Sequence, residues 1–175
     1  FIKNQSASST FYDGNGWFGG LEIMSPSNGY MLYTHQSSSL VYPDFVESEE
    51  LLSRNENVKF DHSILDCNIN PHDYEFNGTV TVKISKNGGQ EGDYLGAFVG
   101  DECRGLAKWR DFPYDDNDEG IYILMTYSNI DKGEEITFKY FNSEDNSIID
   151  YNDSIIFNSD MVIGDGFNSL IISDK

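Results

Sequence analysis

The sequence predicts an all-β protein, an antiparallel β-sandwich of the immunoglobulin-like or jelly-roll-like kind preceded by a small β-rich module. Three observations predict this fold. Apolar and polar residues alternate with a period of two in the second half of the chain, turn residues separate the short apolar runs, and no convincing amphipathic helix lies between them. The lack of crossover helices excludes a parallel α/β sheet, whereas an up-and-down barrel would show the same spacing of strands.

Residues 1–43 form the predicted small module, which is rich in Gly, Ser and aromatic residues. The segment Asp13-Gly14-Asn15-Gly16 is a strong turn signal between short apolar runs. Residues 44–70 are predicted to be a charged linker, which is extended or includes a short surface helix. The short strands predicted in the small module are Ser9–Tyr12, Gly20–Met24, Tyr30–Thr34 and Leu40–Tyr42.

Residues 71–175 form the predicted sandwich. Its clearest strand is Thr79–Ile84, where Val80 and Val82 share one face and polar residues occupy the other. A tight connection at Gly100–Glu102 separates two of the following strands. The other predicted strands are Tyr94–Val99, Arg104–Trp109, Ile121–Tyr127, Ile136–Phe141, Ile148–Tyr151, Ser154–Phe157 and Leu170–Ile172.

The formal net charge of −19, from 30 acidic and 11 basic residues, is unevenly distributed. Residues 1–43 contain Asp13 and Glu22 against Lys3, a net of −1, so residues 44–175 carry −18. This negative potential repels phosphates, which argues against nucleic acid and anionic membrane surfaces as partners. The acidity serves either the solubility of an extracellular protein or the binding of a divalent cation such as calcium. No run of about 18 apolar residues occurs, so we expect no membrane insertion.

Two stretches carry recognisable motifs. The first reads Gly-Trp-Phe-Gly-Gly-Leu over residues 16–21 and continues through Pro26 and Gly29-Tyr30-Met31. The second begins at residues 73–81 and continues with Ala-Phe-Val-Gly-Asp-Glu-Cys-Arg-Gly over residues 97–105. Together they resemble β-rich accessory modules of large secreted surface proteins of the Bacteroidota and related bacteria. The resemblance implies an extracellular module, with no enzymatic activity established for that family.

The two cysteines, Cys67 and Cys103, leave two alternatives open. They fit either a disulfide in an oxidising compartment or two inert buried thiols. Cys103 matches a cysteine of the resembling family, while Cys67 has no counterpart there. Their pairing therefore stays open at the level of sequence.

Catalysis by a nucleophile is not predicted. The chain has no Gly-x-Ser-x-Gly turn, and its histidines lie in segments that resemble loops. Thirty acidic residues offer too many carboxylate pairs for any one pair to indicate glycoside hydrolysis. Arg104 is expected to pair with a carboxylate such as Glu102 rather than to act in a site. The three histidines are His35, His62 and His72.

The best candidate for ligand binding is an aromatic loop. Sugar recognition requires a flat aromatic face beside hydrogen-bonding side chains, and loops at one end of a sandwich are suited to recognition. Trp109 and Tyr114 flank Arg110 and Asp111 in the longest loop of the predicted sandwich. A second patch is weaker, because aromatic residues beside Gly in a small module more often form its core than its binding face; its residues are Trp17, Tyr12 and Tyr30.

The densest acidic cluster is the candidate calcium loop. Oxygen donors alternate and Gly120 stands at the sixth position, as at the start of a calcium-binding loop. Thr126 occupies the twelfth position and supplies no bidentate carboxylate, so the segment is not an EF-hand and a solvated loop remains the alternative. The candidate ligands are Asp115, Asn117, Asp118 and Glu119.

These observations lead to three hypotheses of function. The first is a non-catalytic extracellular or cell-surface binding module, carbohydrate-binding or adhesive, whose partner is a polysaccharide or glycan. The second is a structural or interaction module that spaces, anchors or self-assembles surface-protein domains. The third is a polysaccharide-active enzyme. A well-packed joint between the two parts of the chain, with Trp109 and Tyr114 buried, would favour the second hypothesis over the first.

Overall fold

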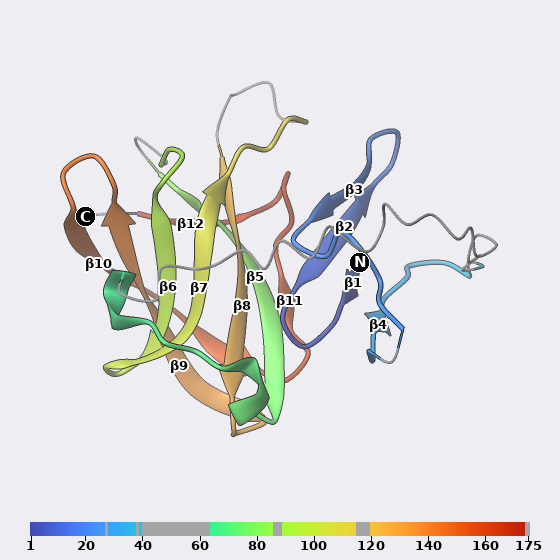
Figure 1. The fold of residues 1–175 in the computed structure, drawn as a ribbon, viewed down its shortest axis with the longest axis horizontal. Helices are drawn as coiled ribbons and strands as arrows, with labels where there is room; N and C mark the ends of the chain where they lie inside the picture. The colour runs from blue at the N-terminus through green and yellow to red at the C-terminus, as the bar shows by residue number, and fades with distance from the viewer. Residues whose placement is uncertain (27, 38, 40–63, 86–88, 115–119, 174–175) are drawn as a thin grey trace.

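The chain folds into two β-sheets that lie side by side (Figure 1). A four-stranded sheet has the order β3-β2-β1-β4, and an eight-stranded sheet has the order β10-β9-β6-β7-β8-β5-β11, with β12 also paired to β5. The all-β, sandwich-like architecture predicted from the sequence is confirmed. The computed structural model describes residues 1–26, 28–37, 39, 64–85, 89–114 and 120–173.

The small sheet corrects one predicted strand. Gly20–Met24 is not a strand, because the N–H groups of Gly20 and Leu21 both donate to the Ser8 carbonyl (2.8 and 3.2 Å) and the chain then leaves the sheet. The predicted turn after Tyr12 is present, and Leu40–Tyr42 lies outside the described residues. The strands of this sheet are β1 (Ile2–Lys3), β2 (Ser8–Tyr12), β3 (Gly16–Gly19) and β4 (Met31–Leu32).

The large sheet contains every strand predicted for this part of the chain. Two predicted strands, Ile148–Tyr151 and Ser154–Phe157, are one strand with an irregularity in register between Tyr151 and Ser154. The strands are β5 (Phe76–Ile84), β6 (Tyr94–Val99), β7 (Glu102–Arg110), β8 (Ile121–Ser128), β9 (Lys132–Asn142), β10 (Ser147–Asn158), β11 (Val162–Ile163) and β12 (Leu170–Ile172).

The pairing is mixed rather than purely antiparallel. Strands β5 to β10 pair with antiparallel neighbours, but β11 and β12 both run parallel to β5. Strand β11 was not predicted, because two residues are too few to show alternation. Both β11 and β12 therefore pair with β5, and the chain departs from β5 in the segment between Ile163 and Leu170.

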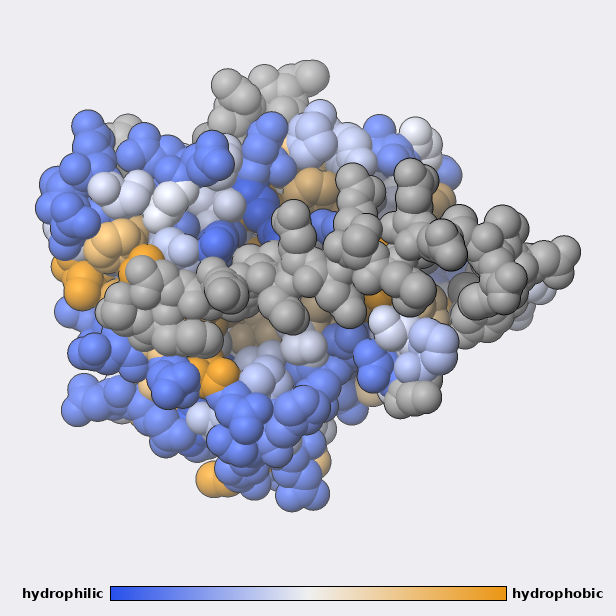
Figure 2. Space-filling view, viewed as in Figure 1, coloured by the Kyte–Doolittle hydropathy of each residue, from blue (hydrophilic) through white to orange (hydrophobic). Residues whose placement is uncertain are grey.

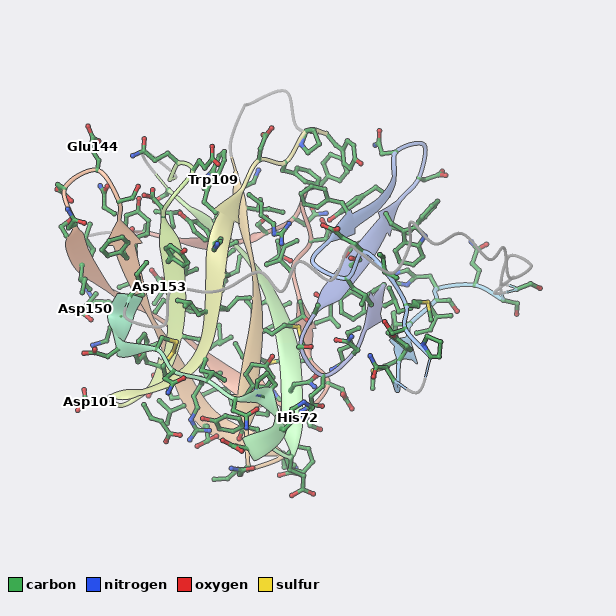
Figure 3. The ribbon with its side chains drawn as sticks, viewed as in Figure 1. His72, Asp101, Trp109, Glu144, Asp150 and Asp153 are labelled. Carbon is green, nitrogen blue, oxygen red and sulfur yellow. A yellow bond between two sulfur atoms is a disulfide. The ribbon has the colours of Figure 1, made fainter. Side chains whose placement is uncertain are left out.

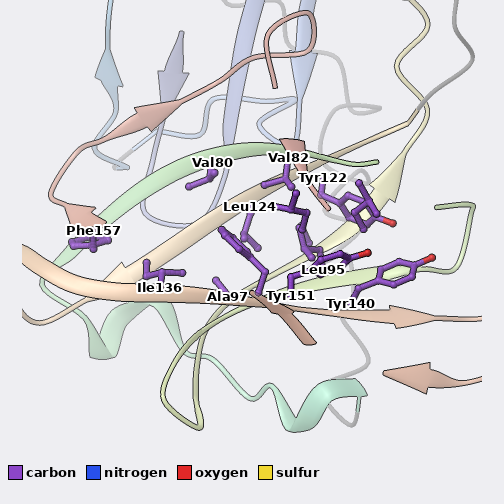
Figure 4. Packing of buried hydrophobic residues seen from close by; sticks show 14 residues of the cluster. Val80, Val82, Leu95, Ala97, Tyr122, Leu124, Ile136, Tyr140, Tyr151 and Phe157 are labelled. Atoms are coloured by element: carbon purple, nitrogen blue, oxygen red, sulfur yellow. The ribbon is translucent and has the colours of Figure 1, made fainter. Parts of the chain in front are cut away.

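The core lies inside a fold of the large sheet. Strand β7 pairs with β6 along Glu102–Lys108 and with β8 at Trp109 and Arg110, so the sheet turns over along this strand. The inward residues of β5, β8 and β12 then meet those of β6, β9 and β10 (Figure 4). Period-two alternation supplies this face, since Val80 and Val82 are fully buried. The central residues also include Leu95, Leu124, Ile136, Phe138, Tyr140, Tyr151, Phe157 and Ile172.

A disulfide attaches the segment before β5 to the sandwich. Cys67 follows a short 3-10 turn (η2, Ile64–Asp66) and is bonded to Cys103 on β7. Leu65 and Phe98 are buried beside the disulfide. The end of the predicted 44–70 linker therefore packs on the sandwich, while residues 40–63 lie outside the described structure.

We predict that removing this cross-link destabilises the fold. The two cysteines are separated by 36 residues. In the chain-entropy model, closing a loop of that size lowers the conformational entropy of the unfolded chain and so stabilises the folded protein by about 4 kcal/mol. The double substitution Cys67→Ser and Cys103→Ser should therefore lower the free energy of unfolding by that order, measured by denaturant titration. The wild type under reducing conditions serves as the control and should behave like the variant. An unchanged midpoint in both would contradict a structural role for the disulfide.

Candidate functional site

The predicted aromatic loop lies at one end of the sandwich, where β7 ends and β8 begins. Trp109 and Arg110 are the last residues of β7 and pair with Tyr122 and Ile121 of β8. Figure 3 shows Trp109 at the end of the sandwich opposite His72. The candidate calcium ligands Asp115, Asn117, Asp118 and Glu119 lie outside the described residues, so the calcium site remains a prediction.

Trp109 is packed against its own chain. The indole is part-buried and contacts the central core, and its N–H is enclosed without a hydrogen-bond partner among the described residues. A Cβ atom placed on Gly120 would lie 2.0 Å from the indole nitrogen, so only glycine admits the ring at this approach. This close contact favours a packing role for Trp109 over stacking on a sugar.

Tyr114 belongs to an aromatic cluster that joins the two sheets. We define this aromatic cluster as Tyr12 and Phe18 of the small sheet with Phe112, Tyr114 and Phe167 of the sandwich. The Tyr114 ring lies 5.3 Å from Phe112 and 5.9 Å from both Tyr12 and Phe18, between ring centroids. Its hydroxyl donates to the Asn15 carbonyl at 3.3 Å. Tyr114 therefore contacts the small sheet from its loop.

Arg110 and Asp111 differ in their surroundings. Arg110 is part-buried, and its guanidinium lies 3.8 Å from the position of a Cβ atom on Gly20, beside the small sheet. Asp111 is exposed. Arg110 and Tyr114 thus lie beside the small sheet, whereas Trp109 packs within the sandwich, and their role in ligand binding stays a prediction.

The second predicted patch is divided between the two faces of the small sheet. Tyr12 points inward: it is buried, and its hydroxyl accepts a hydrogen bond from the Gly166 N–H at 2.7 Å. Trp17 points outward, is 51% exposed and packs edge-to-face on Phe11 at 5.5 Å between centroids. Tyr30 is part-buried, and its hydroxyl bonds the backbone of Ser25. Of the three residues, Trp17 has the exposure that a stacking contact needs.

A buried carboxylate that the sequence analysis did not single out lies near the same end of the sandwich. Asp93 is 1% exposed and accepts hydrogen bonds from the Tyr140 hydroxyl (2.6 Å), from the Ser143 hydroxyl and N–H (2.6 and 2.8 Å), and from the Gln90 N–H (2.9 Å). Burial alone would raise its pKa, but the bonds from Ser143, Tyr140 and Gln90 outweigh it and hold the pKa of Asp93 below its usual value. These internal donors indicate a structural role, joining the β6 turn to the β9–β10 hairpin.

A shallow groove crosses the sheet beside the disulfide. It has a volume of about 320 Å³ and is lined by residues of η2, β6, β9, β10 and the turn before β7. Lys139 lies over the Phe98 ring at 5.1 Å and pairs with Asp150 at 3.3 Å. The lining residues are Leu65, Asp66, Phe98, Asp101, Lys139 and Ile148.

One face of the described surface is largely polar. In Figure 2 most of the described residues in view are hydrophilic and the apolar ones form small groups, as the net charge of −19 leads us to expect. Among the described residues no three His, Cys, Asp or Glu side chains are arranged to hold a metal ion. Within the same residues no helix is long and apolar enough to cross a bilayer. No protein-family model, curated protein or solved structure matches the chain.

We predict that Asp93→Asn destabilises the protein in a pH-dependent way. A neutral amide cannot accept these bonds as a carboxylate does, so the free energy of unfolding at pH 7 should fall by about 1–3 kcal/mol. Because the pKa of Asp93 is lowered by folding, its contribution is complete above the unfolded value of about 3.9 and is lost as the pH falls through the folded value. Denaturant titrations from pH 7 to pH 2 should show the two proteins converging in stability at low pH. A difference that stays constant across this range would contradict the role assigned to Asp93.

Proposed function

We propose that this chain is a non-catalytic, extracellular structural or interaction module that holds neighbouring parts of a larger surface protein at a fixed spacing. The observation that carries the proposal is the joint between the small sheet and the sandwich. It combines the aromatic cluster with buried polar contacts, so that the two sheets form one body. Trp109 and Tyr114 are part-buried against their own chain, and together with the packed joint this favours the structural hypothesis over glycan binding by these two residues.

The apolar part of the joint is extensive for such a small sheet. Phe112 is 1% exposed and lies within 5.2 to 5.3 Å of Tyr12, Phe18, Tyr114 and Phe167, between ring centroids. All four pairs are edge-to-face, a geometry that adds roughly 0.5–1.5 kcal/mol per pair beyond area burial, and the pairs with Tyr12 and Phe18 cross between the sheets. The rings thus resist separation of the sheets.

The polar part of the joint fixes the position of the small sheet relative to the sandwich. Lys3 on β1 is 3% exposed, and its ammonium donates to the side-chain oxygen of Asn77 and to Asp160 of the sandwich. Gln5 donates to the Pro71 carbonyl at 2.9 Å. Separating the sheets would exchange these internal hydrogen bonds for bonds to water, whereas any shift that kept Lys3 buried away from Asn77 and Asp160 would leave its ammonium unpaired at a high cost.

The extracellular part of the proposal is supported by the Cys67–Cys103 disulfide and by the acidic composition. Disulfides persist in oxidising compartments, and a large net charge keeps an exposed protein soluble. Both features agree with the secreted modules that the sequence resembles.

Spin labels at Asp13→Cys and Glu144→Cys would test whether the module is rigid. Both residues are exposed, one at the tip of the β2–β3 hairpin and the other in the β9–β10 turn. Pulsed electron resonance should give one narrow distance distribution for the labelled wild type and a broad one after Phe112→Ala, because that substitution removes the centre of the aromatic cluster. Ile148→Ala, an exposed position away from the joint, is the matched control and should leave the distribution narrow. A broad distribution in the labelled wild type would rule out a fixed spacer.

Glycan binding is a second candidate, and the exposed Trp17 and Phe11 pair favours it. The two rings face each other across β2 and β3 on the outer side of the small sheet, and each is 51% exposed. Such a surface can stack on the C–H groups of a sugar ring. Calcium bound by the acidic loop would contribute to glycan binding separately from this aromatic pair.

Affinity electrophoresis against a panel of soluble polysaccharides, with calcium and with a chelator, would test this candidate. Binding should be lost in Trp17→Ala and retained in Trp109→Phe, since Trp109 is packed against Gly120. If Trp109→Phe lost polysaccharide binding while Trp17→Ala kept it, the binding site would instead lie in the β7–β8 loop. No retardation of the wild type by any polysaccharide would remove the candidate.

A further inference from the structure

The polar part of the joint places an amine against an amide. Lys3 Nζ lies 2.6 Å from Oδ1 of Asn77 and 2.8 Å from Oδ1 of Asp160. Lys3 comes from β1 at the start of the chain, Asn77 from β5, and Asp160 from the turn after β10. A nucleophile, an electrophilic carbonyl and a carboxylate are therefore gathered from three distant segments.

We propose that Lys3 and Asn77 form an intramolecular isopeptide bond, with Asp160 as the proton carrier. Asp160 accepts a proton from the Lys3 ammonium, and the free amine adds to Cγ of Asn77. The Cγ–Nδ2 bond breaks, and Asp160 passes the two protons given up by Lys3 to the departing nitrogen in turn. The products are a secondary amide between Nζ and Cγ, one ammonium ion and Asp160 restored as a carboxylate. No oxidant or cofactor is needed.

The surroundings favour this reaction over simple ion pairing. The Lys3 side chain is 3% exposed, so its nitrogen is held beside the amide, while the Asp160 side chain is 56% exposed and can exchange protons with solvent. Holding the two reacting groups in contact replaces a bimolecular encounter by an intramolecular one. The leaving nitrogen of Asn77 donates to Oε1 of Gln5 at 3.4 Å, which turns the amide so that its oxygen faces Lys3.

Comparison with a lysine of the sandwich shows what the Lys3 site adds. Lys139 also pairs with an aspartate, Asp150, at 3.3 Å, but it is 31% exposed and lies over the Phe98 ring. The Lys3 site adds burial and an amide carbonyl in direct contact with the nitrogen. We therefore assign the covalent bond to Lys3 and not to Lys139.

Intact-mass measurement of the folded, then reduced and denatured, full chain tests the proposal. Formation of the bond removes one ammonia, so the wild type should be about 17 Da lighter than its sequence mass. Fragmentation of a proteolytic digest should identify one cross-linked peptide pair joining Lys3 to Asn77. Lys3→Arg, Asn77→Ala and Asp160→Ala should each have the full sequence mass and no cross-linked pair.

These variants also distinguish the isopeptide bond from a competing reaction that has the same mass change. Asn77 precedes Gly78, and closure of an Asn-Gly step to a succinimide also loses ammonia. A succinimide would persist in Lys3→Arg and would link no peptides, and that result would overturn the proposal. A wild type at its full sequence mass would also overturn it. Neither result depends on whether the module is a spacer or binds glycans.

Discussion

The packing of the small sheet against the sandwich is the contact on which the rest of the structure depends. β1 and β4 contain two residues each, and a sheet built from such short strands is not stable alone in water. Its inner face is stabilised where Tyr12 and Phe18 meet the aromatic residues of the sandwich and where Lys3 reaches the far side of the boundary. Any function of the outer face therefore operates from a support that the sandwich holds in place.

The sandwich separates its charge from its core. Its strands carry apolar residues inward, while exposed carboxylates such as those of Asp111, Glu144 and Asp150 lie on its surface. Two charged groups that enter the interior have several partners: Asp93 receives four hydrogen bonds, and Arg104 lies between Glu102 and Glu134 at 3.3 and 3.1 Å. Among the described residues of the sandwich, Arg104 Nε, the Trp109 N–H and the Tyr122 hydroxyl are enclosed without a hydrogen-bond partner, and the Trp109 ring packs directly on Gly120.

The sequence predicted those parts of the fold that depend on local alternation. Thr79–Ile84 was predicted from its alternation and Tyr94–Val99 from its turn-bounded apolar run, and Arg104 pairs with carboxylates as expected. Both strands are buried on both faces, so the polar face of Thr79–Ile84 is covered rather than open to solvent. Strand β11 and its parallel pairing could not be predicted, because they depend on where the chain returns rather than on its residues. Residues 20–24 appeared apolar enough for a strand, yet hydrogen bonds to Ser8 end the strand at Gly19.

The candidate sites were predicted less well, because an aromatic residue beside glycine has the same sequence pattern in a core and on a surface. Alternation along β2 could have separated Phe11, outside, from Tyr12, inside, but no pattern marks Lys3 as a residue that crosses to Asn77.

Native-state hydrogen exchange tests the central claim, that the two sheets are one body, most directly. The amides of Thr10 and Tyr12 should exchange with the same opening free energy as those of Val80 and Val82, through global unfolding. Exchange of the small sheet at a much lower free energy, while the sandwich stays protected, would contradict it.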